Sequence, residues 1–225
     1  MIFVIGNGTS RKNVNLSILK KHGKVIGCNA LYRNFTPDLL FTFDSDILHE
    51  IISSQYCIDN EVYVLNEISY LPEFAYYDVK NELSNVIEND KNNSVEFISH
   101  GFGGKSFISW IPIKNKIKIV PFDNNGRIFN AGFCACRLAH ELYKTEEIFL
   151  IGFDIYGNTN NIYNYPAIDF TQQIFLFNSL STLYPNINVR RVINDGPELE
   201  TISNINYEEL CQHLQINQKI LITST

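Results

Sequence analysis

Small and amide side chains gather where the first apolar run of the chain ends. The segment Gly6-Asn7-Gly8-Thr9-Ser10 follows the apolar run 2–5. A glycine pair at such a point lets backbone N–H groups approach a phosphate or a ribose closely. The third glycine of the dinucleotide fingerprint is missing, and Asn29 rather than an acid follows the second apolar run. This disfavours a nicotinamide cofactor and leaves two interpretations, a nucleotide-binding turn or a tight structural turn that needs positive φ.

Two carboxylates follow the third apolar run, on either side of one serine. Asp44 and Asp46 are two residues apart, and in an extended chain residues at this spacing point the same way. Both could then hold one Mg²⁺ or Mn²⁺ ion that bridges a diphosphate. The alternative is that one of them caps a helix that begins near Ile47.

A glycine-rich segment, residues 100–106, has the composition of a phosphate-binding loop. The P-loop spacing requires a glycine where this chain has Ser99, and Pro112 cuts the following helix short. We therefore interpret the segment as a structural or lid-like turn. His100 at its start is a second-rank candidate for acid–base catalysis, the alternative being an ordinary loop histidine.

Acids and phenols follow the apolar run 147–151. Asp154 and Tyr156 come directly after it, and Tyr163 and Asp169 lie further along the chain. Because the carboxyl ends of parallel strands converge on one crevice, these groups could contact a phosphate, a sugar or an acceptor. For each tyrosine alone, a half-buried surface position is the alternative.

The elements that position these groups alternate between short apolar runs and helix-like stretches. The predicted strands are residues 2–5, 24–28, 39–43, 62–65, 95–99, 117–120, 147–151 and 189–193. Several are continuous apolar blocks, which is typical of strands covered on both faces. The clearest helix spans residues 131–143, with Asn130 as its cap. This order predicts an α/β fold with a doubly wound, mostly parallel, Rossmann-like sheet and helices on both faces.

Length and composition limit the classes of function. The 225 residues, 45% of them hydrophobic, suffice for one sizeable core, so we expect a single nucleotide-binding domain over residues 1–225. The formal net charge of −6 makes nucleic acid a poor partner. Five cysteines without CxxC spacing, and no charged-then-apolar leader, favour a reduced, cytoplasmic protein. No apolar run reaches the roughly 20 residues that span a bilayer. Aromatic residues such as Phe102, Phe107 and Trp110 are either core or the interface of a homo-oligomer.

Three segments match motifs of one enzyme family in order and approximate spacing. GNGTS at residues 6–10 matches a GNGPS-like turn, residues 28–32 match a CNxxY segment, and residues 130–132 with 151–156 match a TSG-helix-SGIDFY block. In these motifs the chain resembles the bacterial sialyltransferases of glycosyltransferase family 42 and the related motility-accessory glycosyltransferases. The resemblance implies a GT-A-like fold and transfer of a sugar from a CMP-, UDP- or GDP-linked donor to a glycan or another hydroxyl acceptor.

The resemblance also implies which residues contact the donor. It implies nucleotide contact by Asn7, Gly8 and Asn29 and backbone contact near Ala131 and Gly132. The rest of the first turn and the cap of helix 131–143 complete the expected nucleotide site: Gly6, Thr9, Ser10 and Asn130. Tyr156 and Tyr163 are implied to contact the phosphate or the leaving group.

The acid–base catalyst is where the chain departs from the family. The family's catalytic histidine precedes a helix and a late strand, and counting back from residues 189–193 places Asp169 there. A carboxylate can take the acceptor proton if burial or a neighbouring carboxylate raises its pKa. Asp154 and His100 are the other candidates for this role.

A second resemblance leaves another class of enzyme open. Residues 37–45 resemble the third-strand signature of thiamine and pterin pyrophosphokinases, which use that acid to bind magnesium. The resemblance implies pyrophosphoryl transfer from ATP as the main alternative activity. A non-catalytic nucleotide-binding module is the third class that the sequence permits.

Overall fold

The chain folds into two compact units. The computed structural model describes residues 1–42, 44–65, 94–100, 106–112, 117–120, 130–155, 158–159, 161–163, 168–169 and 174–222. One unit combines Met1–Asp38 with Arg127–Thr225, and the other is Leu39–Gly126. The expectation of one domain over residues 1–225 stays a prediction. Tyr156 and Phe102 lie outside the described residues, as do the side chains of Phe107 and Trp110.

The first unit is built on parallel strands. In their order across the sheet, the described strands are β12 (Ser203–Ile205), β11 (Asn188–Val192), β8 (Glu147–Ile151), β1 (Ile2–Ile5) and β2 (Lys24–Cys28). The side chains of β1 are at most 2% exposed, because β1 lies inside the sheet and carries apolar residues on both faces.

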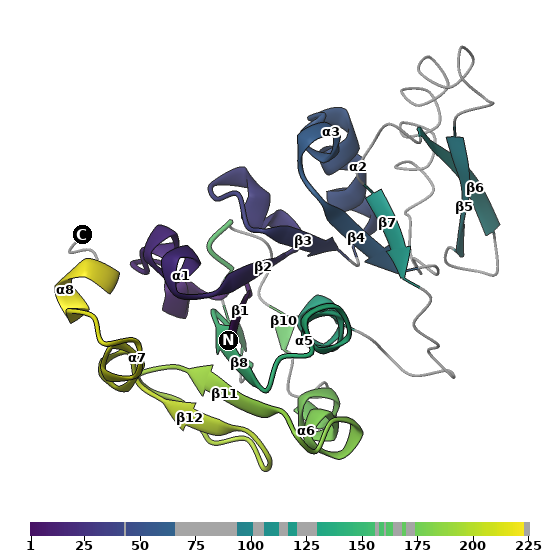
Figure 1. Ribbon diagram of the computed structural model, residues 1–225. Coiled ribbons are helices and arrows are strands. Elements are labelled where there is room, and N and C mark those ends of the chain that lie inside the picture. The colour runs from purple at the N-terminus through teal and green to yellow at the C-terminus, as the bar shows by residue number, and fades with distance from the viewer. Residues whose placement is uncertain are drawn as a thin grey trace. The chain divides into compact units, whose positions relative to one another are not determined.

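Helices cover both faces of these strands (Figure 1). On one face lie α5 (Ala131–Tyr143) and α6 (Ile174–Leu183), and on the other lie α1 (Leu16–His22), α7 (Tyr207–Leu214) and α8 (Gln218–Leu221). The packing of α5 on β1 and β2, and of α1 on β2, fits this arrangement. The predicted α/β fold, with a doubly wound, mostly parallel sheet, is confirmed.

Helix α5 begins and ends at residues with recognisable capping roles. The side chain of Asn130 accepts a hydrogen bond of 2.7 Å from the backbone N–H of Phe133, as predicted for the cap. The helix ends at Lys144, which has a left-handed conformation with φ 48°. Its inward face, which includes Phe133 and Leu138, is buried, so packing on the sheet fixes where the helix start lies.

The second unit contains two separate groups of strands. β3 (Leu39–Thr42), β4 (Val62–Leu65) and β7 (Ile117–Val120) are parallel and lie in that order. They are accompanied by α2 (Ser45–Ser53) and α3 (Tyr56–Asp59). β5 (Ser94–His100) and β6 (Ser106–Pro112) form an antiparallel pair.

The β5–β6 pair corrects two expectations. The predicted strand 95–99 was counted with the parallel strands, but it pairs with β6 in a two-stranded sheet. The residues before Pro112 were expected to form a short helix, but they form β6. A short apolar run does not distinguish helix from strand by its periodicity, and a proline is tolerated at a strand end.

The cysteines behave as core residues. All five are free and buried. Burial raises the pKa of the Cys28 thiol to about 12, and the nearby Arg11 guanidinium only partly opposes this rise. Cys134 and Cys136 of α5 are fully buried, so they pack as small core residues.

Among the described helices, none combines the length and apolar character that crossing a membrane requires.

Candidate functional site

The strand order of the first unit reverses between β1 and β8. The chain continues from β1 to β2 on one side and from β8 to β11 on the other. At such a switch point the loops leave the sheet in opposite directions, and open α/β sheets bind their ligands there. The turn at residues 6–10 and the turn at residues 152–154 both begin at this point.

These two turns are joined by backbone hydrogen bonds. The N–H of Gly6 donates to the carbonyl of Ile151 over 2.8 Å, and the N–H of Gly8 donates to that of Gly152 over 2.9 Å. Gly152 has φ +77°, a conformation that favours glycine. A Cβ atom on Gly8 would lie 2.6 Å from the carboxylate of Asp154. Close approach therefore explains Gly8, and positive φ is required at Gly152 instead.

The start of α5 meets the same region through an aromatic ring. A Cβ atom on Gly132 would lie 2.1 Å from Cε1 of Phe153, and one on Gly6 would lie 3.2 Å from Cε2 of that ring. The turn and the helix start, which were both expected to contact the nucleotide, are thus brought together, and the ring of Phe153 lies against both. Ala131 is 7% exposed and Asn130 is half-buried. A nucleotide contact at Ala131 or Gly132 stays a prediction.

A buried arginine lies beneath the turn after β1. The 3₁₀ helix η1 (Thr9–Arg11) carries Arg11, whose side chain is 3% exposed. Its guanidinium donates to the carbonyl of Gly6, to Oδ1 of Asn7 over 3.1 Å and to the hydroxyl of Tyr163 over 3.2 Å. All three partners are neutral, and none of the described carboxylates forms an ion pair with Arg11.

The environment of Arg11 is unfavourable for its charge. Burial lowers the pKa of Arg11, and the neighbouring Tyr163 opposes this change. Buried cations in proteins are usually neutralised by an anion, because removing a charge from water is costly. The guanidinium therefore supplies positive charge that an anionic ligand at this turn would balance.

Tyr163 covers Arg11 and connects it to the loop after β2. Ile162 N–H donates to the carbonyl of Asn7, which holds residues 161–163 against the turn. The hydroxyl of Tyr163 donates to Oδ1 of Asn34 over 2.8 Å, and the guanidinium of Arg33 lies 5.4 Å from the ring centroid. Burial raises the pKa of Tyr163, although Arg11 and Arg33 oppose it, so the hydroxyl remains a donor at neutral pH.

The two asparagines expected at the nucleotide lie at the ends of adjacent strands. Nδ2 of Asn7 donates to the carbonyl of Cys28 over 3.0 Å. Asn29 follows with φ 49°, and both asparagines are half-buried. Together with Gly8, Thr9 and Ser10, they border the carboxyl ends of β1 and β2. The structure therefore brings these predicted residues together.

Asp154 binds the turn after β1 through one of its two oxygens. Oδ2 accepts a hydrogen bond of 2.9 Å from the N–H of Ser10 and one of 3.2 Å from the hydroxyl of Thr9. Oδ1 is buried and has no hydrogen-bond partner among the described residues. A carboxylate with one committed and one uncommitted oxygen can still accept a donor from a ligand.

The other two candidate bases are described by their backbone. Asp169 ends β10 (Ile168–Asp169), which pairs antiparallel with β9 (Asn158–Thr159). His100 ends β5, in the second unit. The role of either as a base stays a prediction.

The two carboxylates proposed for a metal belong to the second unit. Oδ1 of Asp44 accepts from the N–H of Asp46 over 3.0 Å and from that of Ile47 over 3.4 Å, so Asp44 caps α2. Among the described residues, no group of three His, Cys, Asp or Glu side chains could hold a metal ion. A metal at this pair would have to bind Asp44 while that carboxylate also caps α2. Metal binding there stays a prediction.

Sequence reasoning missed the arginines of this site. Arg11 directly follows the GNGTS turn and Arg33 ends the 3₁₀ helix η2 (Asn29–Arg33) after β2. A basic residue next to a glycine-bearing turn is a signal that could have found Arg11. No comparable signal marks Arg33, because its place beside Tyr163 depends on residues far along the chain.

Comparison with known proteins adds little to this description. No protein-family model matches the chain, and comparison with curated proteins gave no match. Among solved structures, the chain is similar to the X-ray structure of a mutant of alpha-2,3/8-sialyltransferase CstII, with 16% sequence identity and a TM-score of 0.46. The match covers 90% of this chain and 85% of that chain. At this identity and TM-score it supports no argument, and the fold assignment depends on the strand order and pairing given above.

Proposed function

We propose that the chain is a glycosyltransferase that uses a CMP-, UDP- or GDP-linked sugar as donor. The observation that carries the proposal is the buried guanidinium of Arg11, which lies at the switch point beneath a glycine-bearing turn and has only neutral partners among the described residues. The ordered match of three sequence motifs to sugar-transferring enzymes supports a nucleotide sugar over other phosphorylated ligands.

The donor phosphate binds next to Asn7 and Gly8 in this proposal. Arg11 and Arg33 both lie within 6 Å of the ring centroid of Tyr163, at 5.8 and 5.4 Å. Their charges attract the phosphate, and the attraction is strong because Arg11 is screened poorly by solvent. The hydroxyl of Tyr163, which stays protonated, exchanges its acceptor Oδ1 of Asn34 for a phosphate oxygen when the donor binds, and Tyr156 also donates to the phosphate. Asn29 contacts the ribose or the base.

Sugar transfer then requires one bond to form and one to break. The acceptor oxygen attacks the anomeric carbon, and the bond between that carbon and the phosphate oxygen breaks. The electron pair of the broken bond remains on the phosphate oxygen, where Arg11 and Tyr163 stabilise the charge. The acceptor proton passes to a carboxylate, which we assign to Asp169 or Asp154, with His100 as the third candidate.

Thermal unfolding with a panel of nucleotides and nucleotide sugars tests the proposal, with and without Mg²⁺ or Mn²⁺. A bound donor at 100 times its dissociation constant stabilises the fold by about 2.7 kcal/mol. We expect a CMP-, UDP- or GDP-linked sugar to do so and to be hydrolysed slowly without acceptor. Binding of ATP that depends on magnesium and Asp44 would instead indicate a pyrophosphokinase. Nucleotide binding that survives loss of every candidate base, without hydrolysis of any donor, would indicate a non-catalytic module.

A tyrosine pair provides a matched control for the phosphate contact. Tyr163→Phe removes a hydroxyl that accepts 3.2 Å from Arg11, and Tyr184→Phe removes one that accepts 3.2 Å from Arg137, between α5 and α6. We expect Tyr163→Phe to weaken donor binding about tenfold, as loss of a bond to a charged group does, and Tyr184→Phe to leave it unchanged. Equal effects of the two substitutions would argue against a phosphate at Tyr163.

A further inference from the structure

A cavity opens at the carboxyl ends of β1, β8 and β11 in the first unit. Its volume is about 470 Å³, within the range of roughly 300–1,000 Å³ found for small-molecule sites. η1, the loop after β8, the loop after β11 and the start of α7 form its wall. Thr9 and Ser10 of the turn after β1 belong to this wall, so the cavity adjoins the proposed donor site.

Two oxygen atoms on residues of the wall have no hydrogen-bond partner among the described residues. The hydroxyl oxygen of Ser10 and Oδ1 of Asp154 are buried, and neither forms a hydrogen bond with any described residue. The backbone of Ser10 is committed, because its N–H donates to Oδ2 of Asp154 and its carbonyl accepts from the hydroxyl of Tyr207. Buried polar atoms without partners are uncommon in folded proteins, and these two belong to residues in the wall of one cavity.

The charge of the wall differs from that of the donor site. Arg191 is fully buried there and donates to Oδ1 of Asn204 over 2.9 Å and to the carbonyl of Pro197. Two carboxylates, Asp154 and Asp195, line the same cavity. The excess of negative charge disfavours a phosphate. Apolar surface comes from Ile155 and Ile193, and from the ring of Tyr207.

We propose that this cavity binds the acceptor and that the acceptor is a neutral saccharide. A carboxylate oxygen only accepts hydrogen bonds, whereas the Ser10 hydroxyl both donates and accepts. A sugar hydroxyl can donate to Oδ1 of Asp154 while it accepts from Ser10, and the apolar wall can pack against the C–H groups of the ring. That the saccharide is the acceptor rests on the proposed function, and saccharide binding itself does not.

The amide signals of Asn194 and Gly196 report on the cavity in a two-dimensional NMR titration. The probes are the methyl glycosides of glucose, galactose and mannose, with inorganic phosphate as the anionic comparison. We expect at least one glycoside to shift both signals and phosphate to leave them in place. Shifts with phosphate and none with any glycoside would overturn the assignment.

Ser10→Ala tests the hydroxyl directly. It removes a group without a partner and keeps the backbone N–H and carbonyl that Asp154 and Tyr207 use, so the fold is retained. We expect the dissociation constant of the glycoside to rise about three- to tenfold, as for the loss of one neutral hydrogen bond. The control is Ser179→Ala, whose hydroxyl donates to the carbonyl of Leu176 within α6, and it should change nothing. An unchanged dissociation constant in Ser10→Ala would contradict the proposal.

A substitution that fills the cavity gives an independent check. Asp195→Trp places a large ring in the wall, and Glu200→Trp places the same ring on an exposed residue outside it, with the same loss of charge. We expect the first to abolish glycoside shifts and the second to retain them.

The two proposals can fail separately. A chain that binds nucleotide sugars but no glycoside at Asn194 and Gly196 would refute the cavity assignment and leave the proposed function standing. A chain that binds a glycoside there but no nucleotide sugar would refute the proposed function and the name acceptor, and would leave a saccharide site.

Discussion

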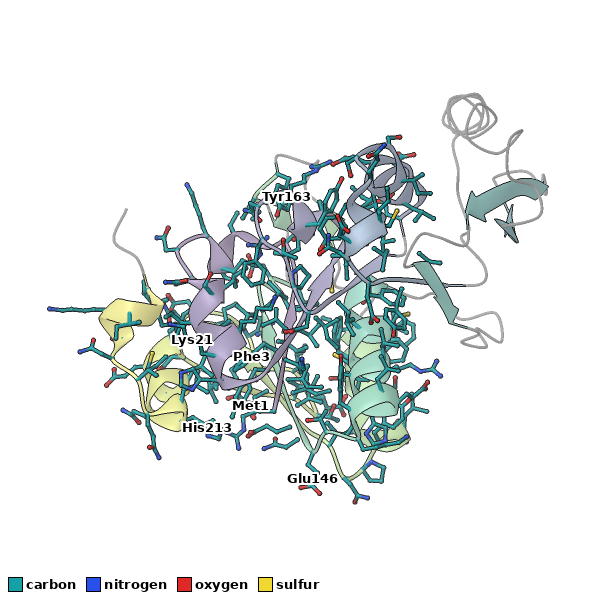
Figure 2. The ribbon with its side chains drawn as sticks, turned by 45° about the horizontal axis from the view of Figure 1, so that its top comes forward. Met1, Phe3, Lys21, Glu146, Tyr163 and His213 are labelled. Atoms are coloured by element: carbon teal, nitrogen blue, oxygen red, sulfur yellow. The ribbon has the colours of Figure 1, made fainter. Side chains whose placement is uncertain are left out.

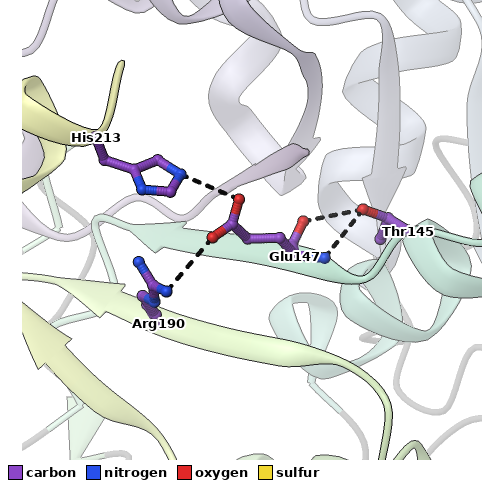
Figure 3. A network of polar contacts seen from close by, with 4 residues as sticks. All are labelled: Thr145, Glu147, Arg190 and His213. Atoms are coloured by element: carbon purple, nitrogen blue, oxygen red, sulfur yellow. Dashed lines mark hydrogen bonds and ion pairs between the residues drawn. The ribbon is translucent and has the colours of Figure 1, made fainter. Parts of the chain in front are cut away.

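The carboxylates at the two ends of strand β8 differ in how far their oxygens are paired. At the amino end, the carboxylate of Glu147 lies 3.6 Å from the guanidinium of Arg190 and 3.1 Å from Nε2 of His213 (Figure 3). Just before the strand, the hydroxyl of Thr145 donates to the backbone carbonyl of Glu147 over 3.0 Å. After the carboxyl end, Asp154 keeps one oxygen without a partner among the described residues. Figure 2 shows Tyr163 at the opposite end of the unit from Met1, Glu146 and His213.

This difference has an energetic side. A half-exposed ion pair such as that of Glu147 is fully satisfied and contributes little, about 0–1 kcal/mol. A buried polar atom without a partner costs about 1–3 kcal/mol, and a buried cation without an anion adds to that cost. Asp154 and Arg11 both lie at the carboxyl end. The comparison supports the proposal that a ligand binds at the carboxyl end of β8.

Removing single carboxylates should separate the two ends most strongly, by their effect on the rate of sugar transfer. We expect Asp169→Asn or Asp154→Asn to slow sugar transfer about 10²- to 10⁴-fold while nucleotide-sugar binding persists, because a positioned base is lost. Glu147→Gln at the amino end should leave the transfer rate within about twofold of the parent. Steady-state rates of the three variants and the parent decide this. Equal turnover in all of them would refute both base assignments.

Overpacking the contact between α5 and the turn should lower stability next most. Gly132→Ala puts a methyl group 2.1 Å from the ring of Phe153, and we expect a loss of about 1–3 kcal/mol in the free energy of unfolding. Urea unfolding measures the loss, and Phe153→Leu in the same chain should recover part of it. An unchanged midpoint would mean that the ring does not lie against Gly132.

Alkaline pH should lower the stability of the fold through the buried thiol of Cys28, at the carboxyl end of β2. Burial raises the pKa of Cys28 in the folded chain from 9.0 to about 12. Above pH 9 the thiol loses its proton in the unfolded chain first, so the free energy of unfolding is unaffected below pH 9 and falls as the pH rises toward 12. For this one thiol the expected loss is roughly 1 kcal/mol by pH 10. Urea unfolding of the parent and of Cys28→Ala from pH 8 to pH 10.5 tests it. An identical pH slope in the two chains would contradict the assigned pKa.

Breaking the amino-end ion pairs should have the smallest effect. Glu147→Gln removes the charge that faces Arg190 and His213, and we expect the free energy of unfolding to fall by at most about 1 kcal/mol. The difference between variant and parent should shrink in 1 M salt, because screening weakens exposed pairs. A loss that is larger and independent of salt would show that this end is more tightly coupled to the core than described.

The strands of the first unit and helix α5 were predictable because their patterns are local. The short apolar runs at residues 2–5 and 147–151 favour strands in a sheet covered on both faces, and Asn130 caps α5 as its position suggested. The partner of β5 was not predictable, since an apolar run does not specify which strand it pairs with. Asp44 was assigned to a metal or a cap, and the local geometry is that of the cap.

The candidate site was predictable only in part. The turn at residues 6–10 and Asn29 are marked by residue type and by their place after strands. The burial of Arg11 under Tyr163 and the grouping of Ser10, Asp154 and Tyr207 depend on contacts between residues far apart in the chain. Residue spacing carries no information about such contacts, and so the arginine and the cavity were missed.

The most direct measurement follows the side-chain Nε–H signal of Arg11 and the amide signal of Gly8 by NMR while CMP, UDP or GDP is added. Our account predicts that one nucleotide shifts both signals and leaves the amides of Thr145 and Glu147, at the other end of β8, unchanged. Shifts at Thr145 and Glu147 with none at Arg11 and Gly8, or no shifts with any of the three nucleotides, would contradict it.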